Sequence, residues 1–241
     1  MISIVIPTLN EEKIINNTLD SLKQIKDIDY EIIISDGKSS DKTIVLSRDY
    51  TNKITVYDKE IRQTISGARN LGASLAEGEY LLFLDADVKL KNQILFLTTL
   101  INSFEKDKSL VGATTRIKIS PENATLIDKI MSFLFIDFPH YFHNNITRTG
   151  STSGEIMFVR KTSFDIIGGF NESLVSCEDL DLFERLAKIG KTTFFWNLTV
   201  YHSGRRFHKI GWFKLVSTWI INVFYYKHYG RTKSIIWEEI R

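Results

Sequence analysis

The sequence has 241 residues, of which 43% are hydrophobic, so it can bury a substantial core and does not have the composition of a disordered chain. Its one cysteine, Cys177, excludes an internal disulfide framework and favours a reducing compartment. No uncharged apolar stretch of about 18 residues occurs, so a membrane-spanning helix is not expected. The chain opens on a strand-like run without a signal peptide, and we predict a cytoplasmic protein.

The first half of the chain alternates short apolar runs with helical patterns, which is typical of a parallel sheet with crossover helices. Five runs rich in Ile, Val and Leu are predicted as strands: Ile2 to Ile6, Tyr30 to Ser35, Lys53 to Tyr57, Glu79 to Leu84 and Leu110 to Ile119. Helical spacing of apolar residues predicts three helices: Glu11 to Ile25, Ile65 to Ala76 and Asn92 to Phe104. Asn10 is the expected N-cap of the first helix.

After about residue 120 the pattern becomes mixed. It contains a GSTSG loop at Gly150 to Gly154, predicted strands at Glu155 to Val159 and Leu198 to Tyr201, and a predicted helix at Asp179 to Ile189. No linker, repeat or low-complexity segment interrupts the chain. We therefore predict an α/β fold with a Rossmann-like, mostly parallel central sheet flanked by helices, in one continuous domain over residues 1–205.

Residues 206–241 are predicted to form a basic, aromatic helical extension. From Gly204 to Arg241 the sequence has eight Lys or Arg against two Glu, and nine aromatic residues that include Trp237. A helical wheel from Trp212 to Lys227 places an apolar face on one side and Lys214, Ser217, Thr218 and His228 largely on the other. Such a helix either packs on the catalytic domain or docks at an anionic membrane surface, which would make the protein peripheral on the cytoplasmic face.

Polar residues follow three of the predicted strands, where ligands bind in an open parallel sheet. The first strand is followed by PTLNEE and the second by DGKSSD, with Asp36 beside Gly37. A carboxylate at this edge can accept hydrogen bonds from a base or sugar. The alternative for DGKSSD is an ordinary turn before a helix capped by Ser40 or Asp41.

Asp85 and Asp87 follow the fourth strand, one residue apart. Two carboxylates so close can share a divalent cation, which relieves their repulsion, and hard oxygen ligands favour Mg²⁺ or Mn²⁺ over zinc. Such an ion would most naturally hold a diphosphate. The alternative is an acidic strand end that caps the following turn.

A second acidic group, Glu178, Asp179 and Asp181, begins the predicted helix in CEDLDLFERL. Acids in a first turn are ordinarily partners of the helix dipole, but Asp179 can be a general base if it faces the metal across a cleft. His202, followed by Arg205 and Arg206, is either structural or part of a phosphate or metal site.

Four segments occur in one order: SIVIPTLNEE, EIIISDGKSSDKT, ARNLGASLAEGEYLLFLDADV and GGFNESLVSCEDLDLFERL. Together they resemble the family-2 glycosyltransferases of GT-A fold, and the resemblance covers about residues 2 to 205. It implies an inverting transfer of a sugar from a nucleotide-diphosphate donor, such as a UDP- or GDP-sugar, to an acceptor hydroxyl, with a divalent metal. The acceptor is a sugar or a lipid-linked molecule, and no nucleic acid is expected as a partner.

The resemblance also implies roles for individual residues. Pro7, Asn10, Glu11, Asp36, Arg69 and Asp85 resemble the family's donor nucleotide site, with Asp85 nearer the ribose. Asp87, with Asp85, matches the metal pair, and His202 resembles a histidine that completes the metal shell in some members. Asp179 matches the catalytic base, and Glu178, Arg205 and Arg206 are expected on the diphosphate or acceptor side.

The sequence departs from the family at Ser35, where a second acid often precedes Asp36, and at Lys38, which replaces a small residue. These changes leave open which nucleobase the donor nucleotide carries. The Q-x-x-R-W motif and spanning helices of processive synthases are not found, so a single-addition enzyme is expected.

Two other functions compete with sugar transfer. The DADV strand end also resembles the first motif of haloacid-dehalogenase-type phosphatases, in which Asp85 would be the nucleophile. A non-catalytic nucleotide-sugar-binding protein would be expected to lack the metal pair or the base, and both are present. A dinucleotide-binding oxidoreductase has no support, because no G-x-G-x-x-G follows the first strand.

Overall fold

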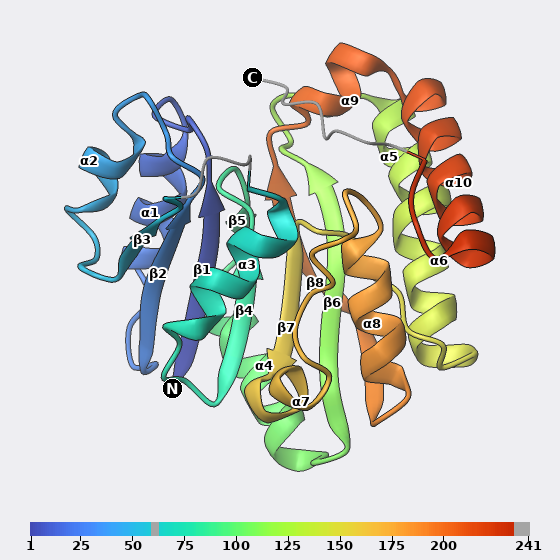
Figure 1. Ribbon diagram of the computed structural model, residues 1–241, viewed down its shortest axis with the longest axis horizontal. Coiled ribbons are helices and arrows are strands. Elements are labelled where there is room, and N and C mark those ends of the chain that lie inside the picture. The colour runs from blue at the N-terminus through green and yellow to red at the C-terminus, as the bar shows by residue number, and fades with distance from the viewer. Residues whose placement is uncertain (59–62, 234–241) are drawn as a thin grey trace.

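The computed structural model describes residues 1–58 and 63–233 (Figure 1). Within them one sheet of eight strands has the order β3-β2-β1-β4-β7-β6-β8-β5. The strands are β1 (Ile2–Thr8), β2 (Tyr30–Asp36), β3 (Ile54–Val56), β4 (Tyr80–Leu84), β5 (Lys89–Leu90), β6 (Leu110–Ile119), β7 (Ile156–Arg160) and β8 (Lys191–His202). The predicted α/β fold is confirmed.

The first half of the sheet is parallel and the second half is mixed. β1 pairs in parallel with β2 and β4, and β2 pairs in parallel with β3. β7 runs antiparallel to both β4 and β6, and β5 runs antiparallel to β8. β6 and β8 form a further parallel pair. The carboxyl ends of β1, β2 and β4 therefore meet at one edge, where Thr8 pairs with Asp36.

Helices cover both faces of the sheet (Figure 1). They are α1 (Ile15–Lys23), α2 (Thr43–Ser47), α3 (Ile65–Ser74), α4 (Gln93–Lys106), α5 (Leu126–Ser132), α6 (Phe138–Tyr141), α7 (Lys161–Ile166), α8 (Glu178–Ala187), α9 (Arg205–Ile210) and α10 (Trp212–Tyr229). α1, α4, α9 and α10 contribute to one core cluster, and α3, α7 and α8 to the other.

The strands supply both clusters in alternation. In β2, Ile32 and Ile34 belong to the first cluster, whereas Ile33, between them, belongs to the second. Alternate side chains of a strand point to opposite faces, so a strand buried on both sides must be apolar at nearly every position. This explains why a strand such as β4, with the sequence YLLFL, is a continuous apolar run. β6 has the predicted bounds, although it also contains Thr, Arg and Lys residues.

Several predicted boundaries were wrong. α1 begins at Ile15 instead of Glu11, and Asn10 is not its N-cap. Asn10 has a left-handed backbone (φ 52°), and its side-chain oxygen accepts hydrogen bonds from Ser40 in the next loop. The N-cap of α2 is Lys42, although the Asp41 carboxylate accepts from the Thr43 N–H.

The largest omission of the sequence analysis is a helical segment over residues 126–146. It runs through α5, the π-helical turn η1 (Phe133–Asp137), α6 and a second π-helical turn, η2 (Phe142–Ile146). Its buried positions include Asp128, Asp137 and His140, and many of its apolar residues are exposed. Because the buried side chains are polar, the usual apolar stripe of a helix is missing and the pattern did not predict one.

The C-terminal helix begins at Trp212 as predicted, but its predicted apolar face is divided. Trp212, Leu215 and Val216 are buried in the main core, whereas Ile220 and Phe224 are 61% and 51% exposed. An amphipathic α10 is therefore not shown, and this arrangement does not support membrane association through α10 itself. Residues 234–241 of the predicted extension, with Trp237, lie outside the described residues.

The division into residues 1–205 and 206–241 stays a prediction. Phe207 and Trp212 belong to the same core cluster as β1, so α9 and α10 are packed on the sheet domain. Among the described residues, no helix has both the length and the apolar character needed to cross a bilayer.

Asp128 ties the segment 126–146 to α9 and α10. Its carboxylate accepts from the Trp212 indole N–H at 2.6 Å, lies 3.1 Å from His208 Nε2, and caps α5 with Thr125. Burial would raise the pKa of Asp128, but these hydrogen bonds outweigh it and lower the pKa to about 2. The charged carboxylate thus stabilises the fold above about pH 4, and this contribution is lost as the pH falls toward 2.

We predict that Asp128→Ala lowers the free energy of unfolding at pH 7 by roughly 2–4 kcal/mol, because the indole and the α5 cap lose their acceptor. Urea unfolding measures this difference, and it should shrink between about pH 4 and pH 2. The exposed Glu122→Ala is the control and should change stability by less than about 0.5 kcal/mol. Equal stability of the Asp128 variant and the wild type at pH 7 would contradict the anchoring role.

Candidate functional site

A cavity of about 1160 Å³ lies at the carboxyl edge of the parallel strands. It is larger than an ordinary ligand pocket of roughly 300–1,000 Å³, so it has room for two substrates. Residues from the ends of β1 and β4, the loop before β7, the start of α8, and the α9–α10 region line it. The sequence-predicted residues in the lining are Pro7, Glu11, Arg69, Asp85, Asp87, Glu178, Asp179, His202, Arg205 and Arg206.

Asp36 and Asn10 organise the loops behind this cavity. Both oxygens of the buried Asp36 carboxylate are used: Thr8 Oγ1 and Ser39 Oγ donate to Oδ2 at 2.7 Å, and the Ser39 N–H donates to Oδ1 at 2.6 Å. Asn10 holds Ser39 and Ser40. Within the described part of this loop, Gly37 lines the cavity, whereas Asp36 does not. The two strand-end loops are therefore fixed to each other.

Arg69 joins the end of β4 to the start of α8. It is 1% exposed, and its guanidinium donates to Glu178 Oε1 at 2.9 Å, to Asp85 Oδ1 at 3.1 Å and to the Gly154 carbonyl at 2.8 Å. A Cβ on Gly154 would lie 2.7 Å from Arg69 Nη2, so only glycine permits this approach. Three segments far apart in sequence converge on one cation.

The acidic groups around Arg69 have strongly shifted pKa values. Desolvation raises the pKa of Asp85 to about 7, although Arg69 acts in the opposite direction. Burial, followed by the charge of Glu178, raises the pKa of Asp179 well above its ordinary value, while Arg69 and the Leu180 N–H lower it. Burial disfavours the charge on Arg69 itself, but its carboxylate neighbours prevail and its pKa is raised. Carboxyls perturbed in this way, in a cavity, are typical of functional sites.

Asp87 is held from the other side of the cavity. Ser203 Oγ donates to Asp87 Oδ2 at 2.5 Å, and Arg205 Nη2 lies 3.4 Å from the same oxygen and 3.3 Å from Glu11 Oε2. Arg205 therefore links the strand-end loop after β1 to the DADV segment.

The carboxylates fit a hard divalent cation better than His202 does. Asp85 and Asp87 both present carboxylate oxygens to the cavity. His202 Nδ1 accepts the Gly204 N–H at 3.1 Å, which puts the proton of a neutral ring on Nε2 and leaves no lone pair for a metal. Among the described residues, no group of three or more His, Cys, Asp or Glu could hold a metal ion. A cation here would need oxygens from its ligand.

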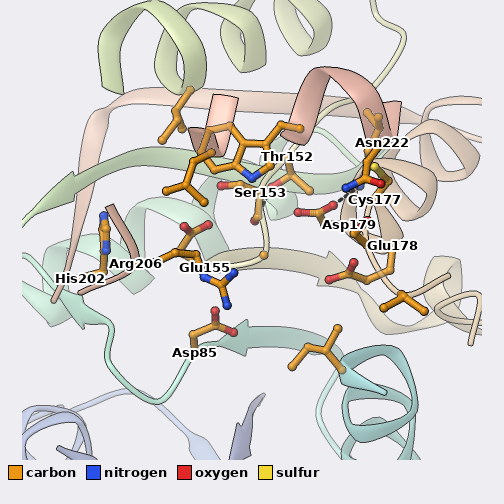
Figure 2. Close-up of a pocket in the computed structure, with 18 of the residues that line it drawn as sticks. Asp85, Thr152, Ser153, Glu155, Cys177, Glu178, Asp179, His202, Arg206 and Asn222 are labelled. Atoms are coloured by element: carbon orange, nitrogen blue, oxygen red, sulfur yellow. Dashed lines mark hydrogen bonds between the residues drawn. The ribbon is translucent and has the colours of Figure 1, made fainter. Parts of the chain in front are cut away.

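Asp85 and Asp179 lie on different sides of the cavity, as Figure 2 shows. Asp85 comes from the end of β4, and Asp179, near Asn222 of α10, from the first turn of α8. Glu155, Thr152 and Ser153 stand between these two sides. The predicted metal pair and the predicted base thus share one cavity.

Sequence reasoning missed the residues contributed by the GSTSG loop and the C-terminal helix. Thr152, Ser153 and Glu155 line the cavity, as does Asn222 of α10. The signal for the loop was its run of small polar residues, to which the sequence pattern assigned no function. For Asn222 the signal was a polar residue between two apolar residues of a helical pattern, and the structure shows that it is buried.

A model of glycosyl transferase family 2 matches residues 3–167. The chain belongs to glycosyl transferase family 2. The predicted resemblance is confirmed, and the phosphatase alternative loses its basis. The matched range contains Asp85 and Asp87 but ends before Asp179 and His202.

Relatives of this family member are larger proteins. It is 27% identical over 195 residues to chondroitin synthase of Pasteurella multocida (strain Pm70), covering 79% of this chain but 19% of that enzyme. It is 38% identical over 100 residues to a poly(ribitol-phosphate) beta-glucosyltransferase of Bacillus spizizenii, covering 39% of this chain and 16% of that enzyme. The chain thus spans about a fifth or less of these two relatives.

Solved structures share the fold of this family member. The mannosyltransferase PcManGT from Pyrobaculum calidifontis, in complex with GDP-Man and Mn²⁺, superposes with a TM-score of 0.65 at 16% identity, covering 84% of this chain and 56% of that one. Residues 1–349 of S. aureus TarS, in complex with UDP-GlcNAc, give 0.64 at 20% identity, covering 92% and 66%. The GT-A fold prediction is confirmed by these matches.

Arg69→Met should lower the free energy of unfolding at pH 7.5 by about 3–5 kcal/mol, because Asp85 and Glu178 lose their buried counter-ion. Denaturant unfolding at several pH values tests this. The loss should be smaller at pH 5, because burial raises the pKa of Asp85 to about 7 and its carboxyl is then mostly protonated. Arg48→Met, at the exposed C-cap of α2, is the control. A loss that does not depend on pH would show that packing, not charge, explains the effect.

Proposed function

We propose that this protein is an inverting, metal-dependent glycosyltransferase that moves one sugar at a time from a UDP- or GDP-sugar to an acceptor hydroxyl. The observation that carries the proposal is the placement of Asp85 and Asp87 in the same cavity as the carboxyl of Asp179. Family membership and the donor complexes of the two superposed enzymes support the nucleotide-sugar donor.

Donor binding is assigned to the strand-end side of the cavity. Pro7 and Glu11 line it after β1, and Asp85 is nearer the ribose. Asp36 and Asn10 fix the shape of this side through the loop hydrogen bonds. Arg69 keeps Asp85 in place. Asp85 and Asp87 would hold Mg²⁺ or Mn²⁺, which supplies charge neutralisation for the leaving diphosphate.

Asp179 is assigned as the general base. Its oxygen removes a proton from the acceptor hydroxyl, and the hydroxyl oxygen attacks the anomeric carbon from the face opposite the diphosphate. The bond from that carbon to the diphosphate breaks, so configuration inverts. Arg205 and Arg206, on the diphosphate side, stabilise the charge that collects on the leaving group. Glu178 raises the proton affinity of Asp179 through its charge.

We propose His202 as a metal ligand only for a state in which its Nδ1 no longer accepts the hydrogen bond from the Gly204 N–H. Its burial beside Phe207, with ring centres 5.2 Å apart, supports a role in shaping the diphosphate side in the present arrangement. The acceptor is proposed to be a sugar or lipid-linked molecule that enters from the side of α8 and α10.

Asp179→Asn should reduce transfer by about 10²- to 10⁴-fold, because a positioned base is lost. Donor affinity, measured by titration calorimetry, should stay within about twofold, since Asp179 is across the cavity from the strand-end side. Asp181→Asn is the matched control: it changes a carboxylate of the same helix that is engaged with Arg185 and Tyr226, and should leave turnover close to normal. Near-normal turnover of the Asp179 variant would remove the assignment.

The wild-type enzyme should also show kcat/KM rising with pH through a pKa well above that of an ordinary aspartate, because protonated Asp179 cannot accept the proton. A rate that is flat from pH 5 to pH 9 would contradict an essential carboxylate base with a raised pKa.

A nucleotide-sugar panel tests the donor class and the cation together. We expect a UDP- or GDP-sugar to raise the melting temperature in the presence of Mn²⁺, and EDTA to remove most of this shift. Asp87→Asn should behave like EDTA treatment, whereas Asp165→Asn, an exposed carboxylate of α7, should behave like the wild type. A full shift in EDTA would contradict the cation role.

A further inference from the structure

The helical segment 126–146 buries mostly polar side chains and exposes a row of apolar ones. Every fourth residue from Asp128 forms a buried row, and every fourth residue from Leu126 forms an exposed row. The buried row is Asp128, Ser132, Ile136, His140 and Asn144, each 8% exposed or less. The exposed row is Leu126, Ile130, Leu134, Phe138, Phe142 and Ile146, between 41% and 71% exposed. A helix at a water-facing surface has the opposite arrangement.

The two π-helical turns keep these rows straight. In a regular α-helix a repeat of four residues drifts by about 40° per step, so a row this long would wind around the helix. η1 and η2 contain wider turns and offset that drift. As a result, the exposed apolar row remains a continuous ridge.

Three polar side chains of the buried row are engaged by the protein. Asp128 binds Trp212, His140 Nδ1 lies 2.8 Å from Ser151 Oγ, and the Asn144 amide donates to the carbonyls of His140 and Ser151. These contacts fix which side of the segment faces the domain. The ridge therefore cannot rotate inward without leaving buried polar groups unpaired.

The exposed charges around the ridge are mainly positive. Residues 123–148 expose Lys129 and Arg148, and residues 204–233 expose five more cations: Lys209, Lys214, Lys227, Arg231 and Lys233. In these two ranges, all of which the structure describes, no Asp or Glu is exposed. The exposed Glu122 lies directly before the first range, and Lys227 pairs with Glu184 of α8. Asp128 of α5 binds both His208 of α9 and Trp212 of α10, so the two ranges adjoin there.

We propose that the ridge of segment 126–146 inserts into the interfacial region of an anionic bilayer, with the surrounding cations on the lipid headgroups. An apolar helix face rimmed by Lys and Arg is the combination that binds such a surface. Phe213, which follows the Asp128 partner Trp212, is a further exposed aromatic residue, with 86% of its surface accessible. The inserted element is thus an internal segment, and α10 supplies charge.

The same segment forms part of the cavity wall through Phe135, Pro139 and His143. Docking by the ridge therefore sets this wall of the cavity at the membrane surface. There a lipid-linked acceptor would be presented to Asp179, a consequence that rests on the proposed function, whereas the docking itself does not.

Cosedimentation with vesicles of equal parts phosphatidylglycerol and phosphatidylcholine tests the docking without any sugar donor. We expect the wild-type protein to partition onto these vesicles, and the triple variant Leu126→Gln, Ile130→Gln, Leu134→Gln to lose at least about tenfold in partition coefficient, because apolar area leaves the interface. Pure phosphatidylcholine vesicles should bind the wild type more weakly, since they carry no net charge.

The matched control is Val45→Gln, Leu95→Gln, Ile166→Gln, which removes three apolar side chains that are 59% to 73% exposed on α2, α4 and α7. It should bind vesicles like the wild type. Both triple variants should keep the wild-type melting temperature and donor-induced shift, which separates lost docking from lost folding or lost sugar transfer. Equal binding of the ridge variant and the wild type would overturn the proposal, as would wild-type protein that binds no vesicles.

A second copy of the chain is the competing occupant of the ridge. Light scattering after size exclusion, at the protein concentration of the vesicle experiment, distinguishes it. A monomer supports the bilayer. A dimer that the ridge variant abolishes would assign the ridge to self-association and overturn the proposal.

Discussion

The buried guanidinium of Arg69 is the interaction on which the site depends. An arginine that is 1% exposed must have its charge balanced within the protein, and Asp85 and Glu178 provide that balance from opposite sides. Asp85 ends a strand of the parallel sheet, whereas Glu178 begins a helix more than ninety residues later. A single cation thereby holds the strand-end side of the cavity and the α8 side at a fixed separation, and Gly154 leaves the room for it.

The charge arrangement also explains why carboxyl groups in one cavity can have different electrostatic surroundings. Asp87 lies among Ser203 and Arg205, in a polar setting suited to a charged ligand. Asp179 follows Glu178 in the first turn of α8, where desolvation and the like charge of Glu178 raise its pKa. Two carboxyls in contrasting environments are the usual basis for dividing ligand binding from proton transfer. Segment 126–146 and α10 then complete the wall, through residues such as Pro139 and Asn222.

The sequence predicted those parts of the fold that follow from local pattern. Strands buried on both faces, such as β4, are apolar throughout, so their positions could be predicted directly from the sequence. The strand-end acids were predictable because parallel strands bring their carboxyl ends together. The segment 126–146 was not, because its polar residues are buried and the 3.6-residue pattern is inverted. Nor could pattern show that Arg69 is sealed between Asp85 and Glu178, that Asn10 binds Ser40 instead of capping α1, or that α10 borders the cavity: these depend on contacts between distant segments.

The most direct test of the two-sided site is diffraction from crystals grown with a nucleotide-diphosphate sugar and Mn²⁺, with data collected at a wavelength where manganese scatters anomalously. We predict an anomalous peak in contact with the Asp85 and Asp87 side, the diphosphate against that peak, and the anomeric carbon turned toward Asp179. A peak and diphosphate beside Glu178 and Asp179, or outside the cavity, would contradict the assignment of the two sides.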